Sequence, residues 1–247
     1  MIGIFTSENI SVMKRKDFLR RGMIGAGTIL AIPSVLTNCS KDDSAITDAV
    51  DETGEVDYES GTSGDCVVSP QETAGPYPIK TPAQLVRENI IADRPGVPLL
   101  INIIVQDQSN SCEPVADVLV DVWHCDADGN YSEYGSYTSE HFLRGRQTTD
   151  TNGNASFLSI YPGWYRGRAP HIHLEVLDSN ENSLKITQIA FPEDVSDEVY
   201  STSEYNGTAD TSNNQDGIFQ DSLQYNMLDS ITGNTTDGFT LTKTIII

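Results

Sequence analysis

The sequence predicts an all-β protein, folded as a two-sheet β-sandwich with long loops. Two observations predict this class. Within residues 66–247, short segments rich in Val, Ile and Leu recur, and many of them alternate apolar with polar residues. Polar turns rich in Gly, Asn and Asp separate these segments, and few stretches show the period of an amphipathic helix.

Six segments of this kind are predicted to be strands. They span residues 98–107, 115–123, 155–161, 171–178, 184–191 and 239–247. The polar segments 126–130 and 150–154 look a little like calcium loops, but their Gly stands two positions too early, so ordinary β-turns are favoured. The acidic segment 192–225 is expected to be a long ordered loop with a short helix near residues 193–200.

The N-terminal residues 1–39 have the features of an export signal. Basic residues at 14–16 and 20–21 precede an apolar run over residues 22–36. That run is shorter than the roughly 20 residues that span a bilayer, and it fits the apolar region of a signal peptide. The motif RKDFLRR resembles a twin-arginine signal with one Arg replaced by Lys, so both the twin-arginine and the Sec routes stay open.

The apolar run leads to Cys39, which resembles the lipidation site of an exported lipoprotein. Asn38 departs from the small residue that is usual before such a Cys, so plain cleavage nearby is the alternative. We therefore expect an exported protein, periplasmic or on the cell surface, that touches the membrane only through a lipid on Cys39.

Residues 40–65 are rich in Asp, Glu, Ser, Thr and Gly and contain few large apolar side chains, so a flexible acidic linker is predicted. The whole chain carries a formal net charge of −21. Nucleic acid is excluded as a partner because its phosphates would be repelled. Residues 66–247 then form one domain.

Three cysteines, Cys66, Cys112 and Cys125, remain in this exported domain, where a disulfide can form. Three residues cannot all pair, and the sequence alone does not fix the connectivity. We favour a Cys66–Cys112 disulfide, which would fasten the start of the domain to a later strand, with Cys125 as a buried thiol.

His171 and His173 are candidate metal ligands. Side chains alternate along a strand, so both imidazoles project from the same face of the segment 171–178. Taken alone, such a pair is more often two surface histidines. The surroundings favour a metal site at one end of the sandwich, because four chemically suitable residues stand nearby on neighbouring turns and strands: Tyr131, Tyr165, Arg168 and Gln188.

Several motifs together resemble the intradiol ring-cleaving dioxygenases, non-haem ferric enzymes that open catechols. They occur in that family's order over residues 66–247: SPQETAGPYPI, VDVWHCDADGNYS, RGRQTTDTNGNASFLSIYPGWY, RGRAPHIHLEV and TQIAF. Each motif alone would be weak, but the ordered set is specific.

The resemblance implies Fe(III) as the cofactor, with four ligands: Tyr131, Tyr165, His171 and His173. Phenolate oxygens are hard, charged donors, and they suit ferric iron better than they suit copper or zinc. The implied reaction cleaves a catecholic compound with O2 to a muconate-type diacid.

The resemblance also implies roles for the neighbouring residues. Arg168 would stabilise negative charge that develops on the ring, and Gln188 would hydrogen-bond with Arg168 or the substrate. Tyr165 would leave the metal and accept a proton. The expected pocket residues are Pro76, Tyr77 and Trp164.

Five residues separate Tyr165 from His171, fewer than in the better-known catabolic members, so the substrate is not carried over from them. The export signal and linker stand where the catechol-cleaving branch has a helical region, which indicates an exported single-domain branch. Two alternatives stay open: a surface-tethered, non-enzymatic module that binds catechols or metal chelates, and a zinc or copper site at the histidine pair. The two tyrosines favour the ferric enzyme.

Overall fold

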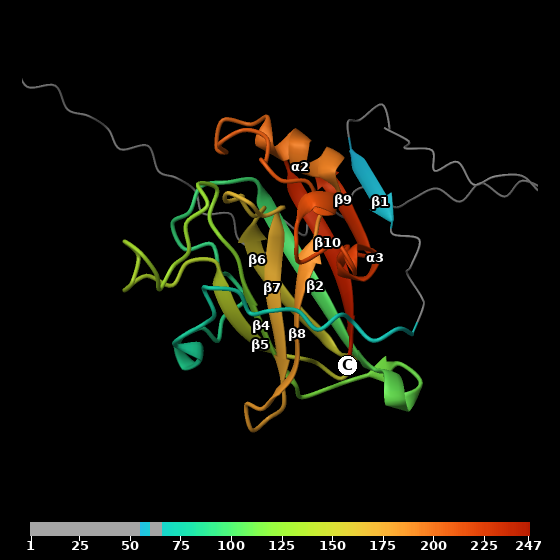
Figure 1. The fold of residues 1–247 in the computed structure, drawn as a ribbon. Helices are drawn as coiled ribbons and strands as arrows, with labels where there is room; N and C mark the ends of the chain where they lie inside the picture. The colour runs from blue at the N-terminus through green and yellow to red at the C-terminus, as the bar shows by residue number, and fades with distance from the viewer. Residues whose placement is uncertain (1–54, 60–65) are drawn as a thin grey trace, which may run out of the picture. The chain divides into compact units, whose positions relative to one another are not determined.

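Two β-sheets form the protein's core (Figure 1). The computed structural model describes residues 55–59 and 66–247, which belong to one unit spanning residues 48–247. Within these residues, the larger sheet has six strands, in the order β1 (Val56–Glu59), β9 (Ser230–Asn234), β10 (Gly238–Ile246), β2 (Pro98–Asp107) and β3 (Glu113–Pro114), with β6 (Asn154–Ile160) also paired to β2. Only the pairing of β10 with β2 is parallel among these.

The second sheet has four strands and is antiparallel throughout. Its order is β5 (Arg144–Thr148), β4 (Leu119–Trp123), β7 (His171–Leu177) and β8 (Ser183–Ala190). The sequence prediction of a two-sheet β-sandwich is therefore confirmed.

The hydrophobic core between the sheets follows from alternation along the strands. On β7, Ile172, Leu174 and Val176 are fully buried and belong to the same cluster as Ile101 and Ile103 of β2. Burying each such side chain contributes about 1.5–3 kcal/mol. Because side chains alternate, the two histidines of β7 must point away from this core, to the outer face of the four-stranded sheet.

Five of the six predicted strands lie within one residue of those observed. The segment 115–123 is the exception, because Asp117 adopts a φ of 60° and β4 begins only at Leu119. The sequence missed the edge strand β5, which reads RGRQT and lacks the apolar pattern of a strand.

The linker prediction is wrong for four residues. Val56–Glu59 form β1, which pairs with β9, and the side chains of Val56 and Tyr58 pack against the core. Alternation within this short segment was enough for an edge strand. The export signal 1–39, the lipidation site Cys39 and residues 40–54 and 60–65 of the proposed linker lie outside the described residues.

The predicted short helix is confirmed as α2 (Glu193–Tyr200). Two acidic residues in its first turn suit the positive end of the helix dipole, while Val195 and Val199 are buried. The following loop contains the short helices η3 (Asn213–Gln215) and α3 (Leu223–Asn226). Two further 3-10 turns are η1 (Pro82–Gln84) and η2 (Gln108–Asn110). Among the described helices, none is long and apolar enough to span a bilayer.

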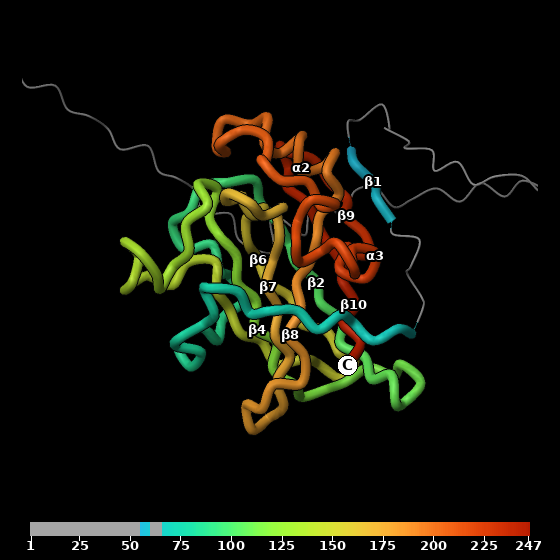
Figure 2. The backbone as a smooth tube through the Cα atoms, viewed as in Figure 1, coloured from blue at the N-terminus to red at the C-terminus, as the bar shows by residue number. Residues whose placement is uncertain are grey.

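Residues 66–81 form a segment that we call the N-terminal strap. It crosses over β8 and β4, as Figure 2 shows in cyan, and Glu72 N donates to Ile186 O of β8 at 2.8 Å. A disulfide joins Cys66 at its start to Cys112, as predicted, and Cys125 is a free buried thiol. The disulfide thus fixes one end of the strap to the larger sheet.

Candidate active site

One row of side chains crosses the outer face of the four-stranded sheet. His173 on β7 pairs in register with Trp123 on β4 and with Gln188 on β8, and Trp123 pairs with Arg144 on β5. Directly opposed residues in a sheet point to the same face, and all four of these side chains are buried. The Trp123 ring stacks on His173, with centroids 5.0 Å apart. The row therefore fixes the orientation of the His173 imidazole.

Two tyrosines reach the histidines from loops. Tyr131 Oη lies 3.5 Å from His171 Nε2, and Tyr165 Oη lies 3.3 Å from the same nitrogen. These separations exceed the roughly 2.7–3.2 Å of a good hydrogen bond between nitrogen and oxygen. They fit donors that share one metal ion, since two bonds of about 2.1 Å at about 110° place their donor atoms about 3.4 Å apart.

The loops that carry the two tyrosines pack closely on each other. Asp126 Oδ1 accepts hydrogen bonds from the backbone N–H of Asp128 and Asn130, which turns the chain back toward Tyr131. Gly163, just before Tyr165, lies against this turn, where an added Cβ would come within 2.2 Å of Asp126 O. Only a glycine at 163 permits this approach.

The His171 imidazole presents a free lone pair to this place, and His173 lies on the same face of the strand. His171 Nδ1 lies 2.7 Å from Ala169 O. A carbonyl can only accept, so Nδ1 carries the proton and Nε2 keeps its lone pair. His173 is fully buried, and neither of its ring nitrogens has a hydrogen-bond partner. Buried polar atoms without partners are rare in proteins and are expected where a ligand binds.

The N-terminal strap covers the row. Gly75 has a φ of +66°, and a Cβ added there would lie 2.8 Å from Cε1 of His173. Tyr77 stacks on the ring of Tyr131, with centroids 4.5 Å apart. The strap is held over the sheet by Gln188 Nε2, which donates to Thr73 O, and by Arg144, which donates to Tyr77 O. It therefore screens the donor atoms from solvent on this side.

A family model described as dioxygenase matches residues 74–228. The chain belongs to the intradiol ring-cleavage dioxygenase family. It is 30% identical over 123 residues to chlorocatechol 1,2-dioxygenase of Rhodococcus opacus, an alignment that covers 42% of this chain and 47% of that protein. It is 33% identical over 113 residues to the protocatechuate 3,4-dioxygenase beta chain of Burkholderia cepacia, covering 40% and 48%.

Among solved structures, an intradiol ring-cleavage dioxygenase from Tetranychus urticae superposes with a TM-score of 0.66 at 31% identity, covering 74% of this chain and 95% of that one. The alignments span about half the length of the two curated relatives. The family's members named here are oxidoreductases.

Burial sets the protonation of the candidate ligands in this member of the intradiol dioxygenase family. It raises the pKa of Tyr131 well above its ordinary value, with Cys125 and Tyr165 adding to the effect. Burial also raises the pKa of Tyr165, although the Arg168 guanidinium opposes it. Burial and Arg168 lower the pKa of His171 to about 3. Without a cation the phenols are neutral at pH 7, and a strong Lewis acid is required to ionise them.

Burial likewise lowers the pKa of His173 far below its ordinary range. Both imidazoles are therefore neutral at pH 7 and available as ligands. No group of three or more His, Cys, Asp and Glu side chains suited to a metal ion occurs in residues 55–59 and 66–247.

Two of the predicted neighbours, Arg168 and Gln188, lie beside the candidate ligands. Arg168 Nη1 is 3.4 Å from both Tyr165 Oη and His171 Nε2, and its Nη2 donates to Gln188 Oε1 at 2.6 Å. The guanidinium thus stands beside the donors, held by the neighbouring strand.

The three predicted pocket residues differ in position. Tyr77 contacts the Tyr131 and Tyr165 rings. Pro76, on the same strap, is exposed. Trp164 packs against the main core and donates its indole N–H to Gly207 O at 2.7 Å.

Sequence reasoning missed two residues beside the site. Gly75 belongs to the SPQETAGPYPI motif, but its contact with His173 joins residues about 100 positions apart and leaves no local signal. Asp216, whose carboxylate accepts from Arg168 Nε at 2.8 Å, lies in a loop whose acidic residues all look alike in the sequence. Only its full burial distinguishes it from them.

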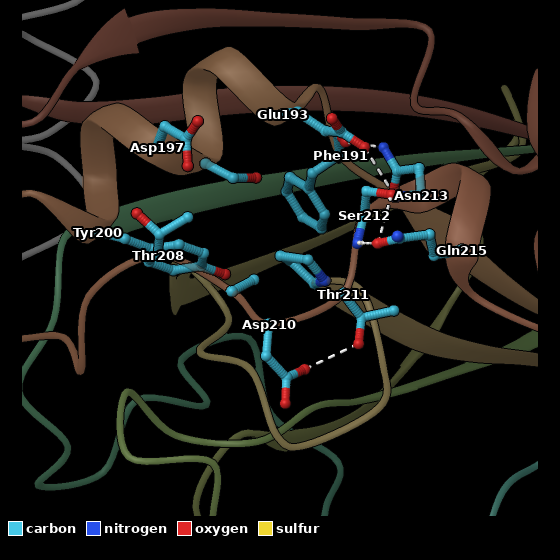
Figure 3. A pocket seen from close by; sticks show the side chains of 13 residues that line it. Phe191, Glu193, Asp197, Tyr200, Thr208, Asp210, Thr211, Ser212, Asn213 and Gln215 are labelled. Carbon is cyan, nitrogen blue, oxygen red and sulfur yellow. Dashed lines mark hydrogen bonds between the residues drawn. The ribbon is translucent and has the colours of Figure 1, made fainter.

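A pocket of about 190 Å³ lies between α2 and residues 208–215 (Figure 3). Its walls include the carboxylates of Glu193, Asp197 and Asp210. None of the four candidate ligands lines it, and Pro170 is its one wall residue next to any of them. We assign no substrate to this pocket.

Proposed function

We propose that this protein is a non-haem Fe(III)-dependent enzyme that cleaves a catecholic compound with O2, giving a muconate-type diacid. Membership of the intradiol family supports the reaction class. The observation that carries the proposal is the convergence of the Tyr131 and Tyr165 hydroxyls on His171 Nε2, beside a His173 whose buried nitrogens have no partner.

The residues fit ferric iron. Tyr131, Tyr165, His171 and His173 would hold it through two phenolates and two neutral imidazoles. The two negative charges would offset most of the ion's charge, which lowers the cost of burying it. When bound, Fe(III) would supply Lewis-acid chemistry that makes a chelating catechol reactive toward O2.

The two tyrosines differ in a way that suits different roles. Tyr131 is 4% exposed and stacked under Tyr77. Tyr165 is only half-buried, and its hydroxyl lies next to the Arg168 guanidinium. Tyr165 is therefore the phenol with room to move and to take a proton from an incoming diol. Tyr131 would stay in place.

Arg168 supplies a fixed positive charge at the same place. Its Nη1 faces Tyr165 Oη and His171 Nε2, so it can stabilise negative charge on a substrate ring in front of them. A preorganised charge of this kind typically contributes several kcal/mol to a reaction. Gln188 keeps the guanidinium in position and ties it to the strap through Thr73 O.

The test is oxygen uptake with a panel of catechols by Fe(III)-loaded protein, with ultraviolet spectra of the products. We expect visible Fe(III)–tyrosinate absorption and muconate-type products without added reductant. Protein that binds catechols but stays colourless and consumes no O2 would favour a binding module, and tight zinc or copper binding without ferric colour would favour the histidine-pair alternative. Because the chain belongs to a family of enzymes, we favour catalysis over the binding module and over the zinc or copper site.

Two variants test the donor set. Tyr131→Phe and His173→Ala should each lose iron and colour, because each removes one of the four donors. Tyr137→Phe is the matched control, since its ring packs on Phe142 and not on the donors. If Tyr131→Phe keeps iron as the control does, the proposed ligand set is wrong.

We also propose that the protein is exported and lipid-anchored at Cys39. The signal-like residues 1–39 carry this proposal, and the Cys66–Cys112 disulfide supports an oxidising compartment. Labelling of the expressed chain with a radioactive fatty acid should mark the wild type but not Cys39→Ser. Equal labelling of both would refute the anchor.

A further inference from the structure

Asp216 is a buried carboxylate beside the candidate centre. Its side chain is 0% exposed, and its Oδ2 accepts hydrogen bonds from Arg168 Nε and from the backbone N–H of Ala169, each at 2.8 Å. Its Oδ1 accepts from Ile218 N at 2.9 Å. Phe219, three residues on, lies under the guanidinium, with the Arg168 Cζ 5.8 Å from its ring centroid. One turn of the long C-terminal loop therefore surrounds the far side of Arg168.

That turn is itself held firmly. Asn213 N donates to Glu193 Oε1 at 2.7 Å, and Asn213 Nδ2 donates to Phe191 O at 2.8 Å (Figure 3). Ser212 and Gln215 form a reciprocal capping box around η3. The carboxylate of Asp216 is consequently placed by the end of β8 and the start of α2, two rigid parts of the fold.

Two hydrogen bonds hold the Arg168 guanidinium, and together they determine where its remaining nitrogen, Nη1, points. Nε is bound to Asp216 and Nη2 to Gln188. With these two edges fixed, the planar group cannot rotate, and Nη1 must face Tyr165 Oη and His171 Nε2. With the Gln188 hydrogen bond alone, the guanidinium could still rotate about that single contact.

The same carboxylate is linked to His171 through the backbone of one residue, Ala169. Asp216 accepts from the N–H of Ala169, and the C=O of Ala169 accepts from His171 Nδ1 at 2.7 Å. The Ala169 carbonyl determines which nitrogen of His171 keeps a lone pair. Holding the Ala169 backbone in place therefore helps to hold the acceptor that sets the tautomer and the ring direction of His171.

We propose that Asp216 is a positioning residue of the active site, one carboxylate that aims both the Arg168 guanidinium and the His171 imidazole. It acts on the iron site and on turnover through these two residues and does not itself touch substrate or metal. Its negative charge also balances Arg168, so that this partly buried cation can lie beside a ferric ion. The inference rests on the proposed function.

Asp216→Asn tests the proposal, because it keeps the shape of the side chain and removes the charge and one acceptor. Asp210→Asn is the matched control: Asp210 lies on the same loop and accepts from Gly167 N at 3.0 Å, next to Arg168 in sequence, but its carboxylate is bonded to Gly167 and Thr211. Fe(III) affinity is measured by competition with a chelator, followed by tyrosinate absorption. We expect about a 10-fold loss for Asp216→Asn, and a change within about twofold for the control.

Turnover gives an independent reading through a double-mutant cycle with Arg168→Gln. Asp216→Asn alone should lower kcat about 10-fold or more with little change in KM, because it disturbs a group that acts on the reacting ring. With Fe(III) saturating, so that the effect of Asp216 on metal binding through His171 does not contribute, the same change should alter kcat less than about twofold in the Arg168→Gln background. Additive losses would show that Asp216 does not act through Arg168, and would overturn the proposal.

A measurement on the metal-free wild type covers the case in which Asp216→Asn does not fold. The Nε–H of Arg168 should exchange with solvent about 100-fold more slowly than that of the exposed Arg166. Equal exchange would contradict the Asp216 contact. Wild type that binds Fe(III) but cleaves no catechol would refute the proposed activity, while the affinity and exchange measurements would still decide the role of Asp216.

Discussion

Replacement of Gly75 by Ala should disturb His173 specifically. The Gly75 backbone has a φ of +66°, and a Cβ built on it would lie 2.8 Å from Cε1 and 3.3 Å from Nε2 of the His173 ring. That ring has no room to retreat, because Trp123 stacks on it with an interplanar angle of 4°. Either the strap must lift or the imidazole must turn.

The cost follows from two terms. An alanine in the left-handed region costs about 1–2 kcal/mol, and forcing an extra carbon into a well-packed place costs about 1–3 kcal/mol. Gly75→Ala should therefore lower the free energy of unfolding by about 2–5 kcal/mol, a large part of the roughly 5–15 kcal/mol that stabilises a typical domain.

Urea unfolding of the metal-free protein measures this loss. Gly135→Ala is the control, since Gly135 has a φ of +56° but no atom within 4 Å of an added Cβ, so that it reports the backbone strain alone. The additional loss of unfolding free energy in Gly75→Ala, relative to Gly135→Ala, measures the clash with His173. Gly75→Ala should also bind Fe(III) more weakly than the control. Equal unfolding free energies and equal iron binding in the two variants would refute this account of how the strap meets His173.

Three further outcomes are expected. Arg168→Ala should keep the ferric colour and lose most of its turnover; full turnover would remove its assigned role. Replacing Cys66 and Cys112 by Ser opens a loop of 46 residues and should cost about 4 kcal/mol in the chain-entropy account, seen as a lower urea midpoint. Burial lowers the pKa of His124 to about 4 in the folded protein. As pH falls from about 6.5 to about 4, His124 is therefore protonated in the unfolded chain while it stays neutral in the folded protein. The free energy of unfolding should fall by about 3 kcal/mol over this range. His124→Gln should remove that part of the pH dependence, and an unchanged slope would contradict it.

Much of the candidate site could be predicted from local pattern. His171 and His173 share a face because strand alternation is a property of the backbone itself, so the sequence was sufficient to pair them. The resemblance to the intradiol family implied that Gln188 would hydrogen-bond with Arg168 or the substrate, and a hydrogen bond between Arg168 and Gln188 is observed, with Gln188 in register with His173. The strand β5 was not predicted, because it is held by pairing with β4 and by the salt bridge between Arg146 and Asp121, and it has no apolar pattern.

By itself, the sequence determined the sandwich class and the strands with alternating apolar residues, because both depend on the period of the backbone. The resemblance to the intradiol family supplied the candidate donors at 131, 165, 171 and 173, and the Cys66–Cys112 disulfide was favoured but not fixed until the structure showed it. The tertiary structure alone decided that Gly75 lies on His173 and that Asp216 lies on Arg168. Those contacts join segments 48 to about 100 residues apart. Such contacts depend on how loops pack onto a finished sheet, and one glycine among 19 or one carboxylate among 36 acidic residues carries no local mark of it.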